Sequence, residues 1–398
     1  MTLSVGDTVA GRFEVREQVG TGGFSIVWRA HDREYDRDVA LKCPDLATHD
    51  TEEVHRRFER EVETLGRFAG GITPSGVVRF LDEDIRSDPR YIALEYLPGD
   101  ELSGILGTGS LGTAVRRRIV IDLSETLDFL HRNGVVYLDL KPENVVLRQR
   151  SRRPVLIDFN TAVDTRDDVE TLFEPDHYKP PELIPETGDP ASAGPHSDVY
   201  SWGKFAFYLL TGAKVPTEHV PDRGVDPINF GASCSRELAE VIRTATIPDV
   251  GERYEDGPAL RDAVAEATRR GPRALLSHLD SNVKCSITDG HTMGRLVGDA
   301  QVPWVVLPDP QQHVSPEHVR FEHSHAGWIV EDNSINGTYV GEHDDWTWVL
   351  SEEGARQHPD VDPDDAPPTA TVVPGTAMVA PVHPDYGIEL RLTVPEPG

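Results

Sequence analysis

Two neighbouring stretches of the chain carry its most informative chemistry: residues 136–147 read VYLDLKPENVVL, and residues 155–160 read VLIDFN. In both stretches, polar side chains stand between apolar runs that are typical of buried strands. These polar residues are Asp139, Lys141, Asn144 and Asp158. Phosphoryl transfer needs this set, because one carboxylate accepts the proton of the attacking hydroxyl, a second carboxylate and an amide oxygen hold Mg²⁺, and a lysine offsets charge on the moving phosphoryl group.

A glycine-rich turn precedes these stretches. Residues 13–45 alternate apolar and polar positions around the segment 20–27, GTGGFSIV, and a further strand at 39–42 reads VALK. The pattern predicts strand, glycine loop, strand, turn, strand. Glycines allow backbone N–H groups to approach phosphate oxygens, but a single glycine cluster is more often an ordinary turn. The turn therefore indicates a phosphate-binding loop only because it precedes the four polar residues named above.

Lys42 ends a strand that reads as buried, where an unpaired ammonium is costly. It therefore needs an anionic ligand or a carboxylate partner, and Glu61 is suitable. Glu61 lies within residues 51–68, whose apolar positions recur at steps of three and four and so predict one face of a helix. Taken singly, the pair also fits a core lysine that reaches solvent and a solvated glutamate.

The order of these motifs resembles the protein-kinase catalytic domain, over residues 1–270. The resemblance implies a fold of two lobes and a list of roles. By this likeness, Lys42, Glu61, Asp139 and Lys141 are catalytic; Gly20, Gly22, Val27, Ala40, Lys42, Glu95 and Leu97 bind ATP; and Asn144 and Asp158 hold the metal. Lys42 would hold the α- and β-phosphates and pair with Glu61, and the backbone of Glu95 and Leu97 would bind adenine.

Later motifs extend the same likeness. Pro181-Glu182 resembles the end of the activation segment, residues 198–203 resemble the buried helix of the large lobe, and Arg253 is expected to form an ion pair with Glu182.

The kinase pattern is broken at three places. The usual His-Arg-Asp triplet reads Tyr137-Leu138-Asp139, and leucine cannot receive a phosphorylated residue through charge-assisted hydrogen bonds. We therefore predict that activity does not depend on phosphorylation of Thr161, Thr165 or Thr171. Asn160 replaces the glycine of Asp-Phe-Gly, and asparagine tolerates positive φ, so the turn should still form. Pro175 replaces the threonine that usually steadies the catalytic aspartate, which leaves substrate choice open.

Two other classes of function compete with an active protein kinase. A pseudokinase would bind nucleotide or act as a scaffold without transfer, but it has no chemical reason to keep the complete catalytic set. A small-molecule phosphotransferase of similar fold fits less well, because the activation-segment motif and the helix at 198–203 belong to protein kinases.

After residue 270 the chain changes character. Arg-Gly-Pro at 270–272 interrupts a helical pattern, and short alternating strands with turn residues follow. Residues 273–394 contain Gly294-Arg295, then Ser315-Pro-Glu-His318, then Asn336-Gly337-Thr338. Singly, these are a surface charge, loop residues and a hairpin turn.

Together, in this order, they resemble the forkhead-associated (FHA) domain, an all-β sandwich. The resemblance implies that Arg295 and Ser315 hold the phosphate of a phosphothreonine peptide, that Asn336 fixes the peptide backbone, and that His318 braces the loop. Pro316 and Ile335 depart from the family pattern and bear on affinity. A disordered acidic, Pro-rich insertion is expected near 342–371.

Composition narrows the class of partner. The 398 residues carry a formal charge of −29, which opposes binding to nucleic acid or to an anionic membrane. We find neither a spanning apolar run nor a signal pattern, and Cys43, Cys234 and Cys285 are expected to be small hydrophobes in a reducing compartment. A cytoplasmic location follows.

The sequence therefore predicts an α+β two-lobed protein-kinase fold, residues 1–270, followed by an all-β FHA-like sandwich, residues 273–394. The predicted protein is a serine/threonine kinase that uses ATP and Mg²⁺, with Mn²⁺ as an alternative ion. Its predicted partners are protein substrates and phosphothreonine peptides or its own phosphorylated loop. The alternative is a pseudokinase/FHA scaffold without phosphoryl transfer.

Overall fold

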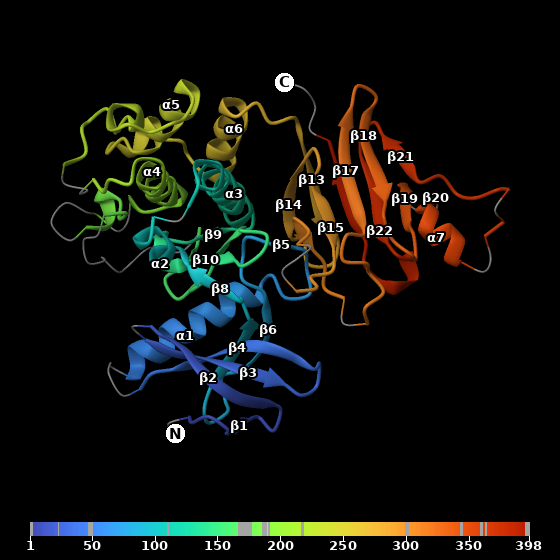
Figure 1. The fold of residues 1–398 in the computed structure, drawn as a ribbon, viewed down its shortest axis with the longest axis horizontal. Helices are drawn as coiled ribbons and strands as arrows, with labels where there is room; N and C mark the ends of the chain where they lie inside the picture. Colours follow the sequence, from blue (N-terminus) through green and yellow to red (C-terminus); the bar gives the residue numbers. More distant parts are fainter. Residues whose placement is uncertain are drawn as a thin grey trace.

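The computed structural model describes residues 3–22, 24–46, 51–109, 111–165, 177–184, 189, 192–215, 219–298, 302–309, 311–342, 345–358, 361–362 and 364–394. Figure 1 shows three parts: a small lobe of strands with one long helix, a lobe built mainly of helices, and a C-terminal half built of strands. The first two parts form the predicted two-lobed α+β fold.

The N-terminal lobe is an antiparallel sheet in the order β1-β2-β3-β4-β7-β6, with one helix, α1. Its bounds are β1 (Thr8–Val9), β2 (Phe13–Thr21), β3 (Ser25–Asp32), β4 (Arg37–Pro44), α1 (Thr51–Gly66), β6 (Phe80–Asp84) and β7 (Tyr91–Glu95). The predicted helix face is confirmed, because Val54, Phe58 and Leu65 are buried together with Glu61. The sheet and α1 thus place Lys42 and Glu61 on elements that face each other.

The second lobe is mainly helical. Its bounds are β8 (Gly99–Glu101), α2 (Leu102–Gly107), α3 (Thr113–Arg132), β9 (Val135–Val136), η1 (Pro142–Asn144), β10 (Val145–Arg148), β11 (Pro154–Leu156), β12 (Val163–Asp164), η2 (Pro181–Leu183), α4 (Pro195–Thr211), η5 (Pro227–Phe230), α5 (Arg236–Ala245), η6 (Val250–Glu252) and α6 (Gly257–Ala267). α3 packs against both α4 and α6 (Figure 1). The indole N–H of Trp202 donates to the carbonyl of Val120 at 3.0 Å, which satisfies a polar atom in this core. Short strands on this framework carry the predicted catalytic loop.

The C-terminal half is the predicted β-sandwich. Its bounds are β13 (Arg273–His278), β14 (Lys284–Thr288), β15 (Thr292–Gly294), β16 (Val305–Val306), β17 (Val319–Ser324), β18 (Gly327–Asp332), β19 (Thr338–Glu342), β20 (Asp345–Val349), α7 (Glu352–Gln357), β21 (Ala370–Val373), β22 (Ala377–Pro381), η7 (Pro384–Tyr386) and β23 (Leu390–Thr393). One sheet has the order β14-β13-β23-β22-β19-β20, and the other has the order β21-β18-β17-β15-β16-β5, in which β5 is Thr73–Pro74. Trp328 and Phe321 are fully buried between them.

The last strand of the second sheet comes from the kinase-like half. β5 (Thr73–Pro74) follows α1 and pairs antiparallel with β16, with Pro74 opposite Val305 and Thr73 opposite Val306. The amide of Ser75 also donates to the carbonyl of Trp304 at 2.9 Å. Buried residues of both halves belong to one hydrophobic cluster. The two halves are therefore joined by a shared sheet as well as by the chain between α6 and β13 (Figure 1).

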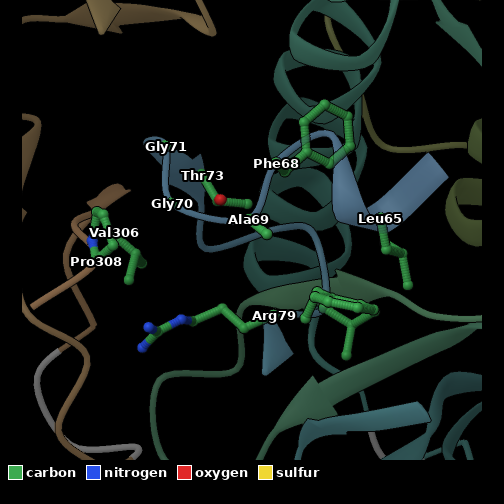
Figure 2. Close-up of a pocket in the computed structure, with 11 residues that line it drawn as sticks. Leu65, Phe68, Ala69, Gly70, Gly71, Thr73, Arg79, Val306 and Pro308 are labelled. Carbon is green, nitrogen blue, oxygen red and sulfur yellow. The ribbon is translucent and has the colours of Figure 1, made fainter. Parts of the chain in front are cut away.

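A small pocket lies at this junction (Figure 2). It is lined by Leu65 and Phe68, by the turn that follows them, by Arg79, and by Val306 and Pro308 of the C-terminal half. The end of the helix that carries Glu61 thus lies close to the β-sandwich.

One expectation about this half was wrong. Residues near 342–371 were predicted to be disordered, but they include β20, which pairs with β19, and the helix α7. The hydroxyl oxygen of Ser351 caps α7 by accepting from the amide of Gly354 at 3.0 Å, and the amide of Ser351 donates to Asp332 at 2.8 Å. The Asp/Pro-rich composition that suggested disorder is concentrated after residue 359, outside these elements.

Other predictions concern the chain as a whole. Cys43 and Cys285 are buried as expected, Cys234 is half-buried, and all three are free thiols. Within the described ranges, no helix combines the length and the apolarity needed to cross a bilayer. The boundary between residues 270 and 273 falls between α6 and β13 and stays a prediction.

Candidate functional site

The predicted catalytic-loop residues lie together between β9 and β10. The ammonium of Lys141 lies 2.8 Å from Asp139 Oδ2, and the side-chain amide of Asn144 donates to the same oxygen at 2.7 Å. The Asn144 amide also donates to the backbone carbonyl of Asp139 at 2.9 Å. These contacts hold the Asp139 carboxylate in one orientation.

A third residue, which sequence reasoning missed, also holds this carboxylate. Lys179 Nζ lies 2.6 Å from Asp139 Oδ1 and donates to the carbonyl of Leu138 at 2.9 Å. Lys179 is 5% exposed, so its charge is offset mainly by protein groups. Its only sequence signal was its place directly before Pro180-Pro181-Glu182, which does not specify a partner 40 residues away.

The pKa of Asp139 lies below its ordinary value. Burial alone would raise this pKa, but the positive charges of Lys179 and Lys141, with their hydrogen bonds, outweigh burial. The carboxylate is therefore ionised near neutral pH and available as a proton acceptor.

Lys42 sits between two carboxylates. Its Nζ lies 2.6 Å from Glu61 Oε2 and 3.0 Å from Asp158 Oδ1, with β4 supplying the lysine and α1 the glutamate. Burial opposes the lysine charge, but the negative charges of Asp158 and Glu61 outweigh burial and raise the pKa of Lys42. Lys42 is therefore a cation paired with Glu61, as the resemblance implied, and it also contacts Asp158.

Backbone contacts lock the segments that carry the two aspartates. The amide of Phe159 donates to Glu61 Oε1 at 3.2 Å, and the ring of Phe159 packs edge-on against Tyr137 with centroids 5.0 Å apart. Tyr137 thus packs as an aromatic residue against the segment that carries Asp158. Asp198 accepts from the amides of both Tyr137 and Leu138 at 2.7 Å.

Two residues of these segments have left-handed backbone conformations. Leu138 has φ of 65° and Asp158 has φ of 61°. Such values are unfavourable for side chains other than glycine and persist only where surrounding contacts fix them. The contacts to Asp198 and Lys179 supply that support at Leu138.

The glycine-rich segment forms the turn of the β2–β3 hairpin. Gly20 pairs with Val27, and the amide of Gly22 donates to the carbonyl of Ser25 at 2.8 Å. Across the next pair of strands, Val27 lies opposite Lys42, and Ala40 lies opposite Leu94 near the end of β7. These predicted ATP-binding positions therefore occupy neighbouring strands of one sheet.

The predicted hinge follows β7. The Glu95 side chain is buried and forms an ion pair with Arg148 at 2.9 Å, and it accepts from the amide of Arg79 at 3.0 Å. The carbonyl of Leu97 accepts from the amide of Gly99 at 2.9 Å. The carboxylate of Glu95 thus has a structural role beside the backbone role that the resemblance implied, and Arg148 was not foreseen.

The donor set at Asn144 and Asp158 fits Mg²⁺. The backbone amide of Ile157 donates to the Asn144 carbonyl at 3.0 Å, which brings the strand before Asp158 against Asn144. A carboxylate and an amide oxygen are hard ligands, and Mg²⁺ commonly takes one or two such protein ligands plus substrate phosphate oxygens. The two residues can therefore hold a magnesium ion together with a nucleotide.

The end of the activation segment is anchored as predicted. Arg253 donates to both oxygens of Glu182, at 2.9 and 3.1 Å, and both residues are buried. Pro175 and Thr171, which the sequence analysis singled out, lie outside the described residues.

The three predicted phosphopeptide residues also lie at one end of the sandwich. A side chain at Gly294 would collide with the backbone of Ser315 and Pro316, so β15 runs directly against this loop. The amide of Arg295 donates to the carbonyl of Ser315 at 3.0 Å, and its guanidinium donates to the carbonyl of Val314 at 3.0 Å. The Asn336 amide donates to the carbonyl of His313 at 2.7 Å.

His318 braces this end from inside, as expected. Its Nδ1 accepts from the amide of Ser315 at 3.0 Å, and its Nε2 lies 3.1 Å from the carbonyl of Gly337. Burial lowers the pKa of His318, which keeps the ring neutral and able to accept at one nitrogen and donate at the other. Ile335, the family departure, is 48% exposed at the same end.

Comparison with known proteins agrees with both halves. The family model described as "Protein kinase domain" matches residues 13–240, and that described as "FHA domain" matches residues 291–345. A probable serine/threonine-protein kinase of Clostridium perfringens is 27% identical over 69% of this chain and 40% of its own length. The serine/threonine-protein kinase PknB of Mycolicibacterium smegmatis is 29% identical over 63% of this chain and 42% of its own length.

The chain thus spans less than half the length of these curated relatives. A solved structure titled "PpkA-294 apo form" superimposes with a TM-score of 0.54 at 20% identity, over 66% of this chain and 99% of that one, which shows the shared fold. From the matched models and the arrangement of the two halves, the chain belongs to the protein kinase family and carries an FHA domain behind its kinase domain.

Proposed function

We propose that this protein is a serine/threonine protein kinase that uses ATP and Mg²⁺, or Mn²⁺, and that its FHA domain binds phosphothreonine. The observation that carries the kinase proposal is the pair of contacts around Lys42, which lies 2.6 Å from Glu61 and 3.0 Å from Asp158. This connected set, with Asp139 held nearby, is the arrangement that phosphoryl transfer requires.

In the proposed reaction, Asp139 orients a Ser or Thr hydroxyl and accepts its proton. The hydroxyl oxygen forms a bond to the γ-phosphorus while the bond from that phosphorus to the β-phosphate oxygen breaks, and ADP leaves. Lys42 would hold the α- and β-phosphates, and Lys141 would offset charge on the transferred group. When bound, Mg²⁺ neutralises phosphate charge, and Asn144 and Asp158 are the residues that would hold it.

The runner-up is a pseudokinase scaffold. The contacts of Asp139 with Lys141 and Asn144 favour the enzyme over the scaffold, because they hold the carboxylate in one orientation toward a substrate hydroxyl. The serine/threonine kinases among the relatives support the choice of Ser and Thr as acceptors.

Separate measurements of binding and transfer distinguish the two. ATP binding is measured by calorimetry with and without Mg²⁺, and transfer to casein is measured with labelled ATP, for the wild type and Asp158→Asn. The kinase proposal expects that Mg²⁺ strengthens ATP binding by the wild type and is required for its transfer. In Asp158→Asn, Mg²⁺ should change neither ATP binding nor transfer. ATP binding without any transfer by the wild type would favour the pseudokinase.

For the FHA domain, we propose that Arg295 and Ser315 bind the phosphate of a phosphothreonine peptide and that Asn336 binds its backbone. An arginine and a hydroxyl suit a dianion, since charge-assisted hydrogen bonds to phosphate are strong. The test is capture on immobilised phosphothreonine peptides. Arg295→Ala should abolish capture, whereas Arg320→Ala, at a half-buried position of β17, should retain it. Equal capture by Arg295→Ala and wild type would refute the reader role.

The proposed partners are protein substrates and phosphothreonine proteins, or the kinase's own phosphorylated loop, so that one phosphorylation guides the next. The charge of −29 supports the proposal that neither nucleic acid nor an anionic membrane is a partner. Three free thiols support the proposed cytoplasmic location.

A further inference from the structure

We propose that Lys179 is a positioning residue for the catalytic base, which supplies from within the chain the positive charge that Leu138 cannot supply. The inference rests on the proposed kinase function. It deepens that function by assigning a role to a residue that lies outside the motifs by which the family was identified.

The geometry places Lys179 directly on the base. Its Nζ lies 2.6 Å from Asp139 Oδ1, while Lys141 and Asn144 contact Asp139 Oδ2 at 2.8 and 2.7 Å. The same Nζ donates to the carbonyl of Leu138 at 2.9 Å. Lys179 therefore fixes both the carboxylate and the peptide group that precedes it.

A second anchor acts on the opposite side of this peptide. The carboxylate of Asp198 accepts from the amides of Tyr137 and Leu138, each at 2.7 Å. Asp198 thus holds the N–H groups and Lys179 holds a carbonyl, with the left-handed Leu138 between them. Such opposed contacts are what an unfavourable backbone conformation requires.

The backbone around Lys179 is itself fixed. Before it, Tyr178 is buried and its ring lies 6.3 Å from that of Phe205. After it, η2 contains Glu182, which the buried Arg253 binds at 2.9 and 3.1 Å. A lysine side chain is flexible, but these neighbours fix the backbone position of Lys179. The ammonium can therefore reach Asp139 without a large loss of conformational entropy.

The contact with Lys179 has a direct consequence for proton transfer. A general base must hold a carboxylate oxygen within hydrogen-bond reach of the substrate hydroxyl, and loss of the Lys179 contact frees one of the two oxygens of Asp139. The chemical step should therefore slow, whereas ATP binding should stay as it is.

A rival interpretation makes Lys179 an obstacle. In this view the ammonium occupies the position of a substrate hydroxyl, and its removal should increase the rate. The two interpretations predict opposite changes in kcat, so one set of variants separates them.

The experiment compares wild type, Lys179→Met, Lys179→Arg and Lys204→Met in transfer of labelled phosphate from ATP to casein. We expect Lys179→Met to lower kcat by roughly 10²-fold and to leave the KM for ATP within about twofold. Lys179→Arg, which keeps the charge and can donate to Asp139, should restore part of kcat. Lys204 is the matched control, since it is 2% exposed and its ammonium bonds a carbonyl of the protein, Val215.

Three outcomes would overturn the proposal: a kcat of Lys179→Met at or above that of the wild type, no recovery of kcat in Lys179→Arg, or the same loss of kcat in Lys204→Met. A thermal unfolding cycle of Lys179→Met, Asp139→Asn and the double variant tests the contact without any transfer assay. The contact predicts that the double variant loses less melting temperature than the sum of the single losses, and additive losses would contradict it. If the wild type transfers no phosphate, the kinase proposal fails, while this cycle still decides whether Lys179 holds Asp139.

Discussion

The side-chain amide of Asn133 in the kinase domain pairs with both backbone groups of Lys284 in the C-terminal β-sandwich. Asn133 Oδ1 accepts from the Lys284 amide at 2.9 Å, and Asn133 Nδ2 donates to the Lys284 carbonyl at 2.8 Å. β14, which begins at Lys284, is an edge strand of its sheet. A helix end of the kinase domain thus satisfies backbone groups that an edge strand would otherwise expose.

We predict that Asn133→Ala weakens the contact between the domains. The substitution removes two hydrogen bonds and leaves backbone groups of Lys284 without this partner, at a cost of roughly 1–3 kcal/mol. Hydrogen exchange should show faster exchange of the Lys284 amide, and the melting temperature should fall. Gln357→Ala, on the exposed α7, should change neither. Unchanged exchange at Lys284 would mean that the domains do not contact each other here in solution.

The contact between the domains should also depend on pH through Glu125 of α3. Burial raises the pKa of this carboxyl from its ordinary value of 4.5 to about 7; Asp122 adds to the rise, whereas Arg270 and Arg261 oppose it. The folded protein holds this proton more tightly than the unfolded chain does. The protonated carboxyl therefore contributes to the free energy of unfolding below pH 4.5, and this contribution is lost as pH rises through 7. The pKa difference between the folded and unfolded states corresponds to roughly 3 kcal/mol of stability.

Glu125→Gln, which cannot ionise, should therefore gain melting temperature relative to the wild type between pH 5.5 and 8. The difference between the two proteins isolates Glu125 from its neighbour His291, whose lowered pKa acts in the opposite sense as pH falls below 6.5. A constant difference in melting temperature across this range would show that Glu125 titrates normally.

His318→Ala should weaken phosphopeptide binding although His318 is fully buried. The histidine links the amide of Ser315 to the carbonyl of Gly337, and loss of this brace frees the loop that carries Ser315. We expect roughly a tenfold loss of affinity, measured by fluorescence anisotropy with a phosphothreonine peptide selected from a degenerate library by the wild-type protein. His323→Ala, at an exposed position of β17, is the control and should bind normally. Full affinity in His318→Ala would show that the loop needs no internal support.

Treatment with a phosphatase should leave kinase activity intact. Lys179 already supplies a cation at Asp139, Leu138 offers no group for a phosphate, and Thr161 is buried with its hydroxyl donating to the carbonyl of Tyr137 at 3.2 Å. The initial rate of the dephosphorylated protein should equal that of untreated protein within about twofold, and Thr165→Ala should behave in the same way. A fall to background after dephosphorylation would establish control by phosphorylation.

The sequence predicted the parts of the site that local motifs encode. Asp139, Lys141 and Asn144 lie within six residues of one another, and their spacing alone places them in one loop. The partner of Lys42 was predictable because the helix face of 51–68 pointed to Glu61, and the pairing of Glu182 with Arg253 followed from the family likeness.

Contacts between distant segments could not be predicted from the sequence. Lys179 and Arg148 carry no periodic or motif signal, and their carboxylate partners are 40 and 53 residues away. β5 is two residues long and contains Pro74, which normally argues against a strand, yet proline is accepted here because β5 is the edge of its sheet. The prediction of disorder near 342–371 was wrong because it used the average composition of the segment, which does not show the short apolar pattern of β20.

Autophosphorylation is the measurement that tests the central claim most directly. Wild type and Asp139→Asn are incubated with labelled ATP and Mg²⁺, and the labelled protein is hydrolysed for phosphoamino-acid analysis. The kinase mechanism predicts phosphoserine or phosphothreonine in the wild type and a loss of roughly 10²-fold or more in the variant. Equal labelling of both proteins would contradict the role of Asp139, and no labelling of either would contradict phosphoryl transfer itself.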